Sequence, residues 1–159
     1  MDRTVIHTPI GPLTLEARDG FLVAVGFRGG PGADPGPGSL LERAAREIRE
    51  YLEGRRTRLT VPYRLPDRAT PFQRRVWAAL ERIPYGRVRT YGEIARELGT
   101  SPRAVGGACA ANPLPLLVPC HRVVARSGLG GFAGQWQTGL ALDVKRVLLD
   151  LEARISGGR

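Results

Sequence analysis

The chain has 159 residues, enough for one full-sized domain or for two small domains with separate cores. Hydrophobic residues make up 42% and charged residues 25%, a balance that excludes an intrinsically disordered chain. The sequence has no apolar run near the roughly 20 residues that a membrane helix needs, and its start lacks the basic-then-apolar order of a signal peptide. We therefore expect a cytoplasmic protein.

Basic residues outnumber acidic ones, 24 to 15, and the excess is concentrated in residues 67–159, which hold 14 basic and 7 acidic residues. Such a charge attracts polyanions and makes nucleic acid the leading partner class. Two other interpretations stay open at this point. A basic surface also serves solubility, and the preference for arginine, with Lys145 as the single lysine, can reflect genome composition.

The first part of the chain predicts a small sheet. Residues 4–8 and 13–27 alternate apolar and polar side chains around the Asp-Gly pair at 19–20, which indicates strands joined by a hairpin. A turn-rich loop rich in glycine and proline follows at 29–38.

A helix comes next, with Ser39 and Glu42 at the spacing of a capping box and one apolar face along "LLERAAREIREYLEG". Strands followed by one helix predict a small α+β unit. The proline-containing connector after it places a domain boundary near Pro66, so we predict domains at residues 1–66 and 67–159.

Three segments of the second part carry helix-start signals. Each pairs a Ser or Thr N-cap with a proline at the first helical position or with Gln or Glu three residues on. The signals are Thr70 with Pro71 and Gln73, Thr90 with Glu93, and Ser101 with Pro102. The second and third helices are short and separated by residues 99–101, which predicts a helix-turn-helix.

The third of these helices consists mainly of small residues, although each glycine costs about 1 kcal/mol of helix propensity relative to alanine. Tight packing against a neighbouring helix would explain this composition. Close approach to a nucleic-acid groove would explain it equally, with Arg103 as the long cationic side chain beside the small ones. The small residues are Ala104, Gly106, Gly107, Ala108, Ala110 and Ala111.

The two cysteines, Cys109 and Cys120, are too few for a disulfide framework or a four-cysteine zinc site, and we expect no metal. Cys109 lies in the small-residue helix, where a buried hydrophobic role is expected. Cys120 follows the apolar run 114–118, which predicts a buried strand, and precedes His121. Because neighbours in an extended strand face opposite sides, His121 can activate this thiol only through a bent backbone or a bridging water.

The segments "IPYGRVRTYGEIA", "RAVGGACAANP" and "PLPLLVPCHRVV" occur in this order at the spacing found in the O6-alkylguanine-DNA alkyltransferases, which the chain closely resembles over residues 70–125. The likeness extends more loosely over "TPIGPLTLEARDGFLVAVGF". It implies an α+β fold in which a small ribonuclease-H-like α/β domain precedes a winged-helix-like DNA-binding domain with a helix-turn-helix.

The resemblance implies repair of DNA by direct, irreversible transfer of a methyl or larger alkyl group from O6-alkylguanine to Cys120, once per molecule, without a cofactor. O4-alkylthymine is a second candidate substrate. His121 would deprotonate the thiol through a water, Glu152 would orient His121, and Asn112 would brace the adjoining turn. Tyr91 would crowd the neighbouring phosphate and donate to guanine N3, while Arg122 would brace the site.

The resemblance also assigns the contacts with DNA. The small-residue helix would lie in the minor groove, with Ala104, Gly106, Gly107 and Ala110 allowing close approach. Arg103 would fill the gap left by a flipped base, a step that costs a few kcal/mol. Carbonyl groups of Cys120 and Val123 would accept from the guanine amino group. We expect a monomer, and cooperative binding along DNA is left open.

The chain departs from the family pattern at residues 130–140, where it has extra residues and where Phe132 occupies the position of a tyrosine. Trp136 could line the alkyl pocket or pack on the final helix, and both interpretations stay open. Two alternatives for the whole protein also remain. One is an alkyltransferase-like protein that binds lesions without transfer, although such proteins lack the acceptor cysteine. The other is a Cys-His hydrolase.

Overall fold

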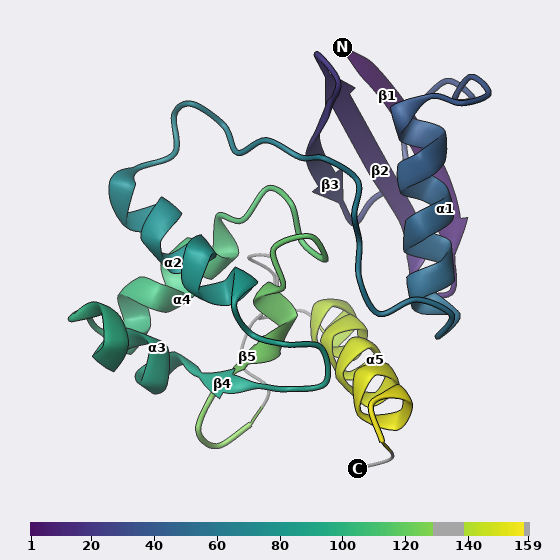
Figure 1. Cartoon of the computed structure of the whole chain (residues 1–159). Helices are drawn as coiled ribbons and strands as arrows, with labels where there is room; N and C mark the ends of the chain where they lie inside the picture. The colour runs from purple at the N-terminus through teal and green to yellow at the C-terminus, as the bar shows by residue number, and fades with distance from the viewer. Residues whose placement is uncertain (129–138, 158–159) are drawn as a thin grey trace. The chain divides into compact units, whose positions relative to one another are not determined.

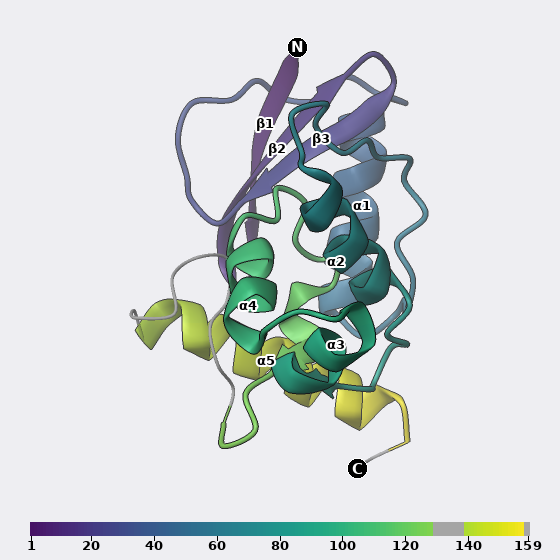
Figure 2. The ribbon, with the colours of Figure 1, turned by 90° about the vertical axis from the view of Figure 1, so that its left-hand side faces the viewer.

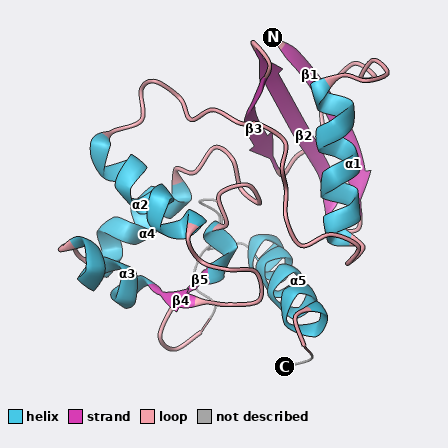
Figure 3. Ribbon diagram, in the orientation of Figure 1, coloured by secondary structure: helices cyan, strands magenta, loops and turns pink. Residues whose placement is uncertain are grey.

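The computed structural model describes residues 1–128 and 139–157, which form a mixed arrangement of helices and short sheets (Figures 1 and 3). The chain divides into two compact units, Met1–Asp67 and Arg68–Arg159. The first unit contains β1 (Asp2–Thr8), β2 (Gly11–Arg18), β3 (Phe21–Gly26) and α1 (Leu40–Leu52). The second contains α2 (Pro71–Glu81), β4 (Arg89–Thr90), α3 (Tyr91–Leu98), α4 (Pro102–Ala110), the 3₁₀ turn η1 (Cys120–Arg122), β5 (Val123–Val124) and α5 (Gly139–Ile155).

The sheet of the first unit is an antiparallel meander in the order β1-β2-β3. Asp19 and Gly20 join β2 to β3 with positive φ angles of 53° and 84°. Two successive left-handed residues give a turn whose twist matches that of the paired strands, and Asp-Gly is a preferred pair there. The predicted hairpin is confirmed at this position.

Helix α1 packs its apolar face against the sheet (Figure 1). Its N-cap is Ser39, whose Oγ accepts a hydrogen bond from the Glu42 amide at 3.1 Å. The Glu42 carboxylate accepts from the amide of Gly38 at 2.7 Å, so the reciprocal bond of the expected capping box is shifted by one residue. The core between helix and sheet consists of Ile6, Leu13, Leu15, Leu22, Val25, Leu41, Ala44, Ala45, Ile48 and Tyr51.

A buried carboxylate attaches the connector after α1 to this unit. Glu47 accepts hydrogen bonds from the backbone amides of Thr60 and Val61, at 2.7 and 3.1 Å, and from the Arg43 guanidinium at 3.1 Å. The chain then pairs with β3, where the Leu22 amide donates to the Pro62 carbonyl at 2.9 Å. Residues far apart in sequence are thereby joined within one small unit.

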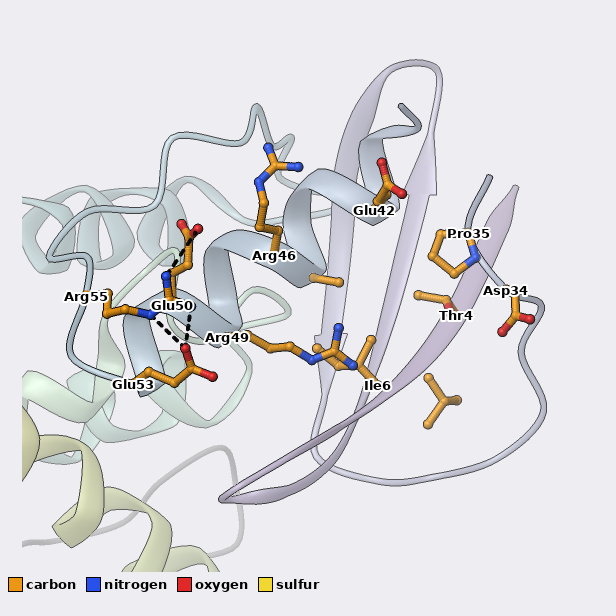
Figure 4. Close-up of a pocket in the computed structure, with 12 residues that line it drawn as sticks. Thr4, Ile6, Asp34, Pro35, Glu42, Arg46, Arg49, Glu50, Glu53 and Arg55 are labelled. Atoms are coloured by element: carbon orange, nitrogen blue, oxygen red, sulfur yellow. Dashed lines mark hydrogen bonds and ion pairs between the residues drawn. The ribbon is translucent and has the colours of Figure 1, made fainter. Parts of the chain in front are cut away.

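A groove of about 670 Å³ lies between β1, the loop at Asp34 and α1 (Figure 4). Charges of both signs line it: Arg46, Arg49 and Glu42 from α1, and Asp34 from the loop. None of the residues predicted for the active site lies among those that line this groove.

Three helices of the second unit begin where the sequence predicts. Thr70 with Gln73 and Thr90 with Glu93 form complete capping boxes, and Ser101 caps α4 through the Ala104 amide. Helix α3 ends at Gly99, which has a left-handed φ of 69°. A three-residue turn then leads to α4, which packs on α2 and α3 (Figure 2). Within residues 1–128 and 139–157, no helix has the length and apolar character needed to cross a membrane.

Candidate active site

The backbone around Cys120 is bent. The predicted buried strand at 114–118 is wrong, because this segment forms a turn in which the Val118 amide donates to the Leu114 carbonyl at 2.9 Å. Leu116 lies in the left-handed region with a φ of 77°. Pro115 removes an amide donor inside this segment, and Pro113 and Pro119 remove those on either side of it. Apolar composition is therefore explained here by burial of a turn.

Cys120 opens the 3₁₀ turn η1, in which the Arg122 amide donates to the Pro119 carbonyl at 3.0 Å. Cys120 and His121 are both buried. In a helical turn, consecutive side chains no longer point to opposite faces as they do in a strand. Of the two conditions under which His121 could activate the neighbouring thiol, a bent backbone or a bridging water, the first is therefore present.

Asn112 holds the turn that leads to Cys120. Its side-chain amide donates to the Val118 carbonyl at 2.8 Å, and its side-chain oxygen accepts from the Leu114 amide at 2.9 Å. The Cys120 amide donates to the same Val118 carbonyl at 2.8 Å. Both hydrogen-bonding ends of a buried amide side chain are thus used to fix the segment before the cysteine.

Helix α5 brings Glu152 to His121, 31 residues away in sequence. The His121 Nε2 and Glu152 Oε2 atoms are 2.7 Å apart, and both side chains are buried. Burial opposes ionisation of Glu152, but hydrogen bonds and charges from His121 and Arg122 outweigh it, so the pKa of Glu152 lies well below its ordinary value. An ionised carboxylate only accepts hydrogen bonds, so Nε2 carries the proton, and Nδ1 of the neutral ring carries the lone pair.

Arg122 and Gly86 hold the same carboxylate. Arg122 donates from Nε to Oε1 and from Nη2 to Oε2 of Glu152, each at 2.9 Å, and from Nη1 to the Ile83 carbonyl at 2.8 Å. The Gly86 amide donates to Oε1 at 3.0 Å. Gly86 has a φ of 81°, and a Cβ there would lie 2.6 Å from the Ser156 Cβ, so both conformation and space require glycine.

Lys145 also faces the site. Its side chain is fully buried, and its Nζ lies 3.4 Å from the Tyr91 hydroxyl. Burial lowers the pKa of Lys145 to about 8, against the electrostatic attraction of Cys120 and Cys109. A buried cation beside a thiol favours the thiolate, which is the nucleophilic form of cysteine.

The two cysteines have different surroundings. Burial, together with the charge of Cys120, raises the pKa of Cys109 to about 12. Cys109 therefore remains a thiol at neutral pH and packs in the core of the second unit, as predicted for a small hydrophobic residue. Cys120 has the neighbouring base and hydrogen-bonded turn that a reactive cysteine needs.

Helix α4 has one packed face and one open face. Val105, Ala108 and Cys109 are buried, and the Trp77 indole donates to the Ala108 carbonyl at 2.9 Å. On the other side, a Cβ added at Gly106 or Gly107 would meet no described atom within 4 Å. Within the described residues, tight packing therefore does not explain these two glycines. Arg103 and Gly107 are exposed, and Ala104, Gly106 and Ala110 are partly exposed.

The chain has relatives among proteins of known family. Residues 71–154 match the family model described as "6-O-methylguanine DNA methyltransferase, DNA binding domain". A methylated-DNA–protein-cysteine methyltransferase of Methanosarcina acetivorans is 39% identical over 157 residues, which cover 93% of this chain and 96% of the relative. One from Archaeoglobus fulgidus is 46% identical over 108 residues, 68% of this chain and 72% of the relative. The chain belongs to the methylated-DNA–protein-cysteine methyltransferase family.

Solved structures of methyltransferases have the same fold. The O6-methylguanine methyltransferase of Mycobacterium tuberculosis is 37% identical, with a TM-score of 0.81 over 99% of this chain and 96% of that one. A structure of the M. tuberculosis protein in complex with DNA is 38% identical, with a TM-score of 0.81, and covers 98% of this chain and 94% of that one.

Of the other residues predicted from the family pattern, Tyr91 begins α3 and Val123 begins β5, which pairs in parallel with β4. Val123 is buried, and its amide donates to the Cys120 carbonyl. That carbonyl keeps a second lone pair for another donor. Phe132 and Trp136 lie outside the described residues, so their predicted contacts with substrate remain predictions.

Lys145, Gly86 and the contacts of Arg122 were not predicted from the sequence. One signal could have revealed Lys145. It lies seven residues before Glu152, which is two helical turns, so both side chains fall on one face of α5. A lysine on the same stripe as buried leucines is unusual. Among the described residues, no three His, Cys, Asp or Glu side chains are placed to hold a metal ion.

Proposed function

We propose that this chain repairs DNA by transferring a methyl or larger alkyl group from O6-alkylguanine to the thiol of Cys120. The observation that carries the proposal is the buried His121–Glu152 pair directly beside Cys120, with 2.7 Å between ring nitrogen and carboxylate. Transfer would be irreversible and would occur once per molecule, because a thioether is a stable product. O4-alkylthymine is a second candidate substrate.

The reaction is an in-line displacement at the alkyl carbon. The Cys120 thiol proton passes through a water molecule to Nδ1 of His121, which acts as general base. The thiolate then attacks the carbon as the carbon–oxygen bond breaks, and the electron pair of that bond stays on the guanine. Glu152 orients His121 and fixes its tautomer, and Asn112 holds the turn. The Tyr91 hydroxyl hydrogen-bonds guanine N3, where negative charge develops.

Lys145 adds a positive charge to this site. A thiolate in a buried site is costly unless a cation lies near it, and Lys145 is electrostatically coupled to Cys120. Lys145 Nζ lies 3.4 Å from the Tyr91 hydroxyl oxygen. Because an ammonium group only donates hydrogen bonds, this contact favours the orientation in which the Tyr91 hydroxyl donates its own proton to guanine N3.

The open face of α4 supports binding in the minor groove of duplex DNA. Small residues at this face allow the backbone to approach the groove, and Arg103 at the start of the helix can occupy the space of a flipped base. Within this proposal, α3 and α4 form a helix-turn-helix of a winged-helix-like domain at 67–159, and residues 1–66 form a ribonuclease-H-like domain. The protein would act as a monomer in the cytoplasm.

Two other functions are less well supported. A lesion-binding protein without transfer activity would not need an acceptor thiol, and Cys120 is present beside a base. A hydrolase would leave the open basic start of α4 without a role. Curated relatives at 36–46% identity are named as methyltransferases.

The test is to incubate the protein with a duplex that contains one O6-methylguanine and to measure the intact mass. We expect a gain of one methyl group, located at Cys120 by peptide mapping. Cys109→Ala should gain the same mass, whereas Cys120→Ala should gain none and still bind the duplex. Mass gain at another residue, or unchanged mass with the duplex bound, would exclude the proposal.

A further inference from the structure

The guanidinium of Arg122 binds both oxygens of the Glu152 carboxylate, and it shares Oε2 with Nε2 of His121. The two Arg122–Glu152 hydrogen bonds are parallel and both 2.9 Å long, and a third bond ties Nη1 to the Ile83 carbonyl at 2.8 Å. The Arg122 guanidinium also lies 5.6 Å from the centre of the Tyr85 ring. A bidentate pair held at a further point has little freedom to rotate.

The charge of Glu152 has two opposite consequences for its neighbour. It orients the imidazole, but an uncompensated carboxylate 2.7 Å away also stabilises the charged imidazolium of His121. An imidazolium has no lone pair and cannot accept a proton from a thiol. A general base in this position therefore needs the carboxylate to orient its ring. It also needs the negative charge of that carboxylate to be partly compensated, so that the ring stays neutral.

We propose that Arg122 is a positioning residue that balances the charge of Glu152, so that His121 is oriented by the carboxylate and remains neutral. The role rests on the proposed function, in which His121 accepts the proton of Cys120. It differs from simple bracing, because it requires the positive charge of Arg122 in addition to its shape.

The charged and titratable groups around His121 agree with this assignment. Glu152 and Lys145 face it from α5, Cys120 and Arg122 lie on the same turn, and Tyr85 stands beside Arg122. Burial lowers the pKa of His121 below its ordinary value; Glu152 opposes this effect, and the charges of Arg122 and Lys145 add to it. Removal of the Arg122 charge should therefore raise the pKa of His121.

The test uses the fact that the chain has only two histidines, of which His7 is exposed and serves as an internal reference. Ring nitrogen and carbon signals of labelled histidine report both tautomer and midpoint. In the wild type we expect His121 neutral at pH 7, with its proton on Nε2. In Arg122→Met the midpoint of His121 should move up by about one pH unit or more relative to the wild type.

Arg122→Lys is the matched control. It keeps the charge and loses the bidentate geometry, so its His121 midpoint should stay near the wild-type value even if the transfer rate falls at every pH. In Arg122→Met the rate should instead fall about tenfold for each pH unit below the new midpoint and recover above it. A purely bracing role predicts equal losses at all pH values in both variants.

Each outcome decides the matter. An unchanged His121 midpoint in folded Arg122→Met overturns the inference, and so does an imidazolium at pH 7 in the wild type, a measurement that needs no variant. Methyl transfer by the wild type is measured separately. If transfer occurs and the midpoint is unchanged, the inference alone fails. If Cys120 gains no methyl group, the proposed function fails, whatever the histidine signals show.

Discussion

Each unit of the protein buries one glutamate against arginine, and the two sites differ in what else they bind. Glu47 in the first unit is 2% exposed and Glu152 in the second is 1% exposed. Glu47 accepts from Arg43 and from the amides of Thr60 and Val61. Glu152 accepts from His121 as well as from Arg122 and the Gly86 amide.

The difference shows what distinguishes a structural carboxylate from a candidate functional one. Both carboxylates have a lowered pKa, because hydrogen bonds and positive charges outweigh the effect of burial. Of the two carboxylates, only Glu152 contacts a titratable ring. That ring belongs to His121, the neighbour of the Cys120 thiol. Burial and pairing with arginine therefore indicate no function alone, whereas contact with a histidine next to a buried cysteine does.

The largest expected effect separates the two carboxylates by their chemistry. Glu152→Gln should lower the rate of methyl transfer by about 100-fold or more, because an amide can donate to Nε2 and allow the wrong tautomer of His121. Glu47→Gln should leave the rate per folded molecule unchanged. Single-turnover transfer from methylated duplex measures both. Equal losses in the two variants would remove the distinction.

The second prediction concerns stability. Glu47→Gln places an amide group against the amides of Thr60 and Val61 and the Arg43 guanidinium, so at least one of these donors loses its acceptor. We expect the free energy of unfolding to fall by about 2 kcal/mol. Urea denaturation followed by circular dichroism measures this loss. Unchanged stability would mean that the connector is held by its backbone pairing to β3 alone.

A third prediction sharpens the comparison through a buried cation that has no counterpart in the first unit's site. Lys145→Met should lower the transfer rate by about tenfold, since about 1.4 kcal/mol of stabilisation of the thiolate would be lost. The same change should raise the melting temperature by a few degrees, because it removes a buried charge. A fall in both quantities would assign Lys145 a structural role.

The fourth prediction concerns the pH dependence of that stability difference. The pKa of Lys145 is about 8 in the folded protein and 10.5 in the unfolded chain, so the unfolded chain binds more protons between these values. Wild-type stability should therefore rise, relative to Lys145→Met, as the pH increases from about 8 to about 10.5. Thermal melts of both proteins across this range measure the difference in stability between them. This difference should not change between pH 6 and pH 7.

Much of the local structure could be predicted because it depends on neighbouring residues. The capping boxes at Thr70 and Thr90, the left-handed stop at Gly99 and the Asp-Gly hairpin each lie within a few residues of sequence. The run at 114–118 was predicted wrongly because apolar composition indicates burial and does not distinguish a strand from a turn. The positive φ of Leu116 could not be predicted, because no comparable pattern in the neighbouring residues marks it.

The amino-acid sequence by itself determined the capped helices and the hairpin, because their signals lie within a few residues of one another. The cysteine, base and asparagine of the candidate site were assigned by the resemblance of the sequence motifs to a known family. Only the tertiary structure decided that Arg122 and Gly86 share the Glu152 carboxylate and that Lys145 points its charge toward Cys120 and Tyr91. These contacts join residues 30, 66 and 54 positions apart. Their energies depend on burial and on the distance between charges, and neither quantity exists until α5 packs against the turn that holds the cysteine.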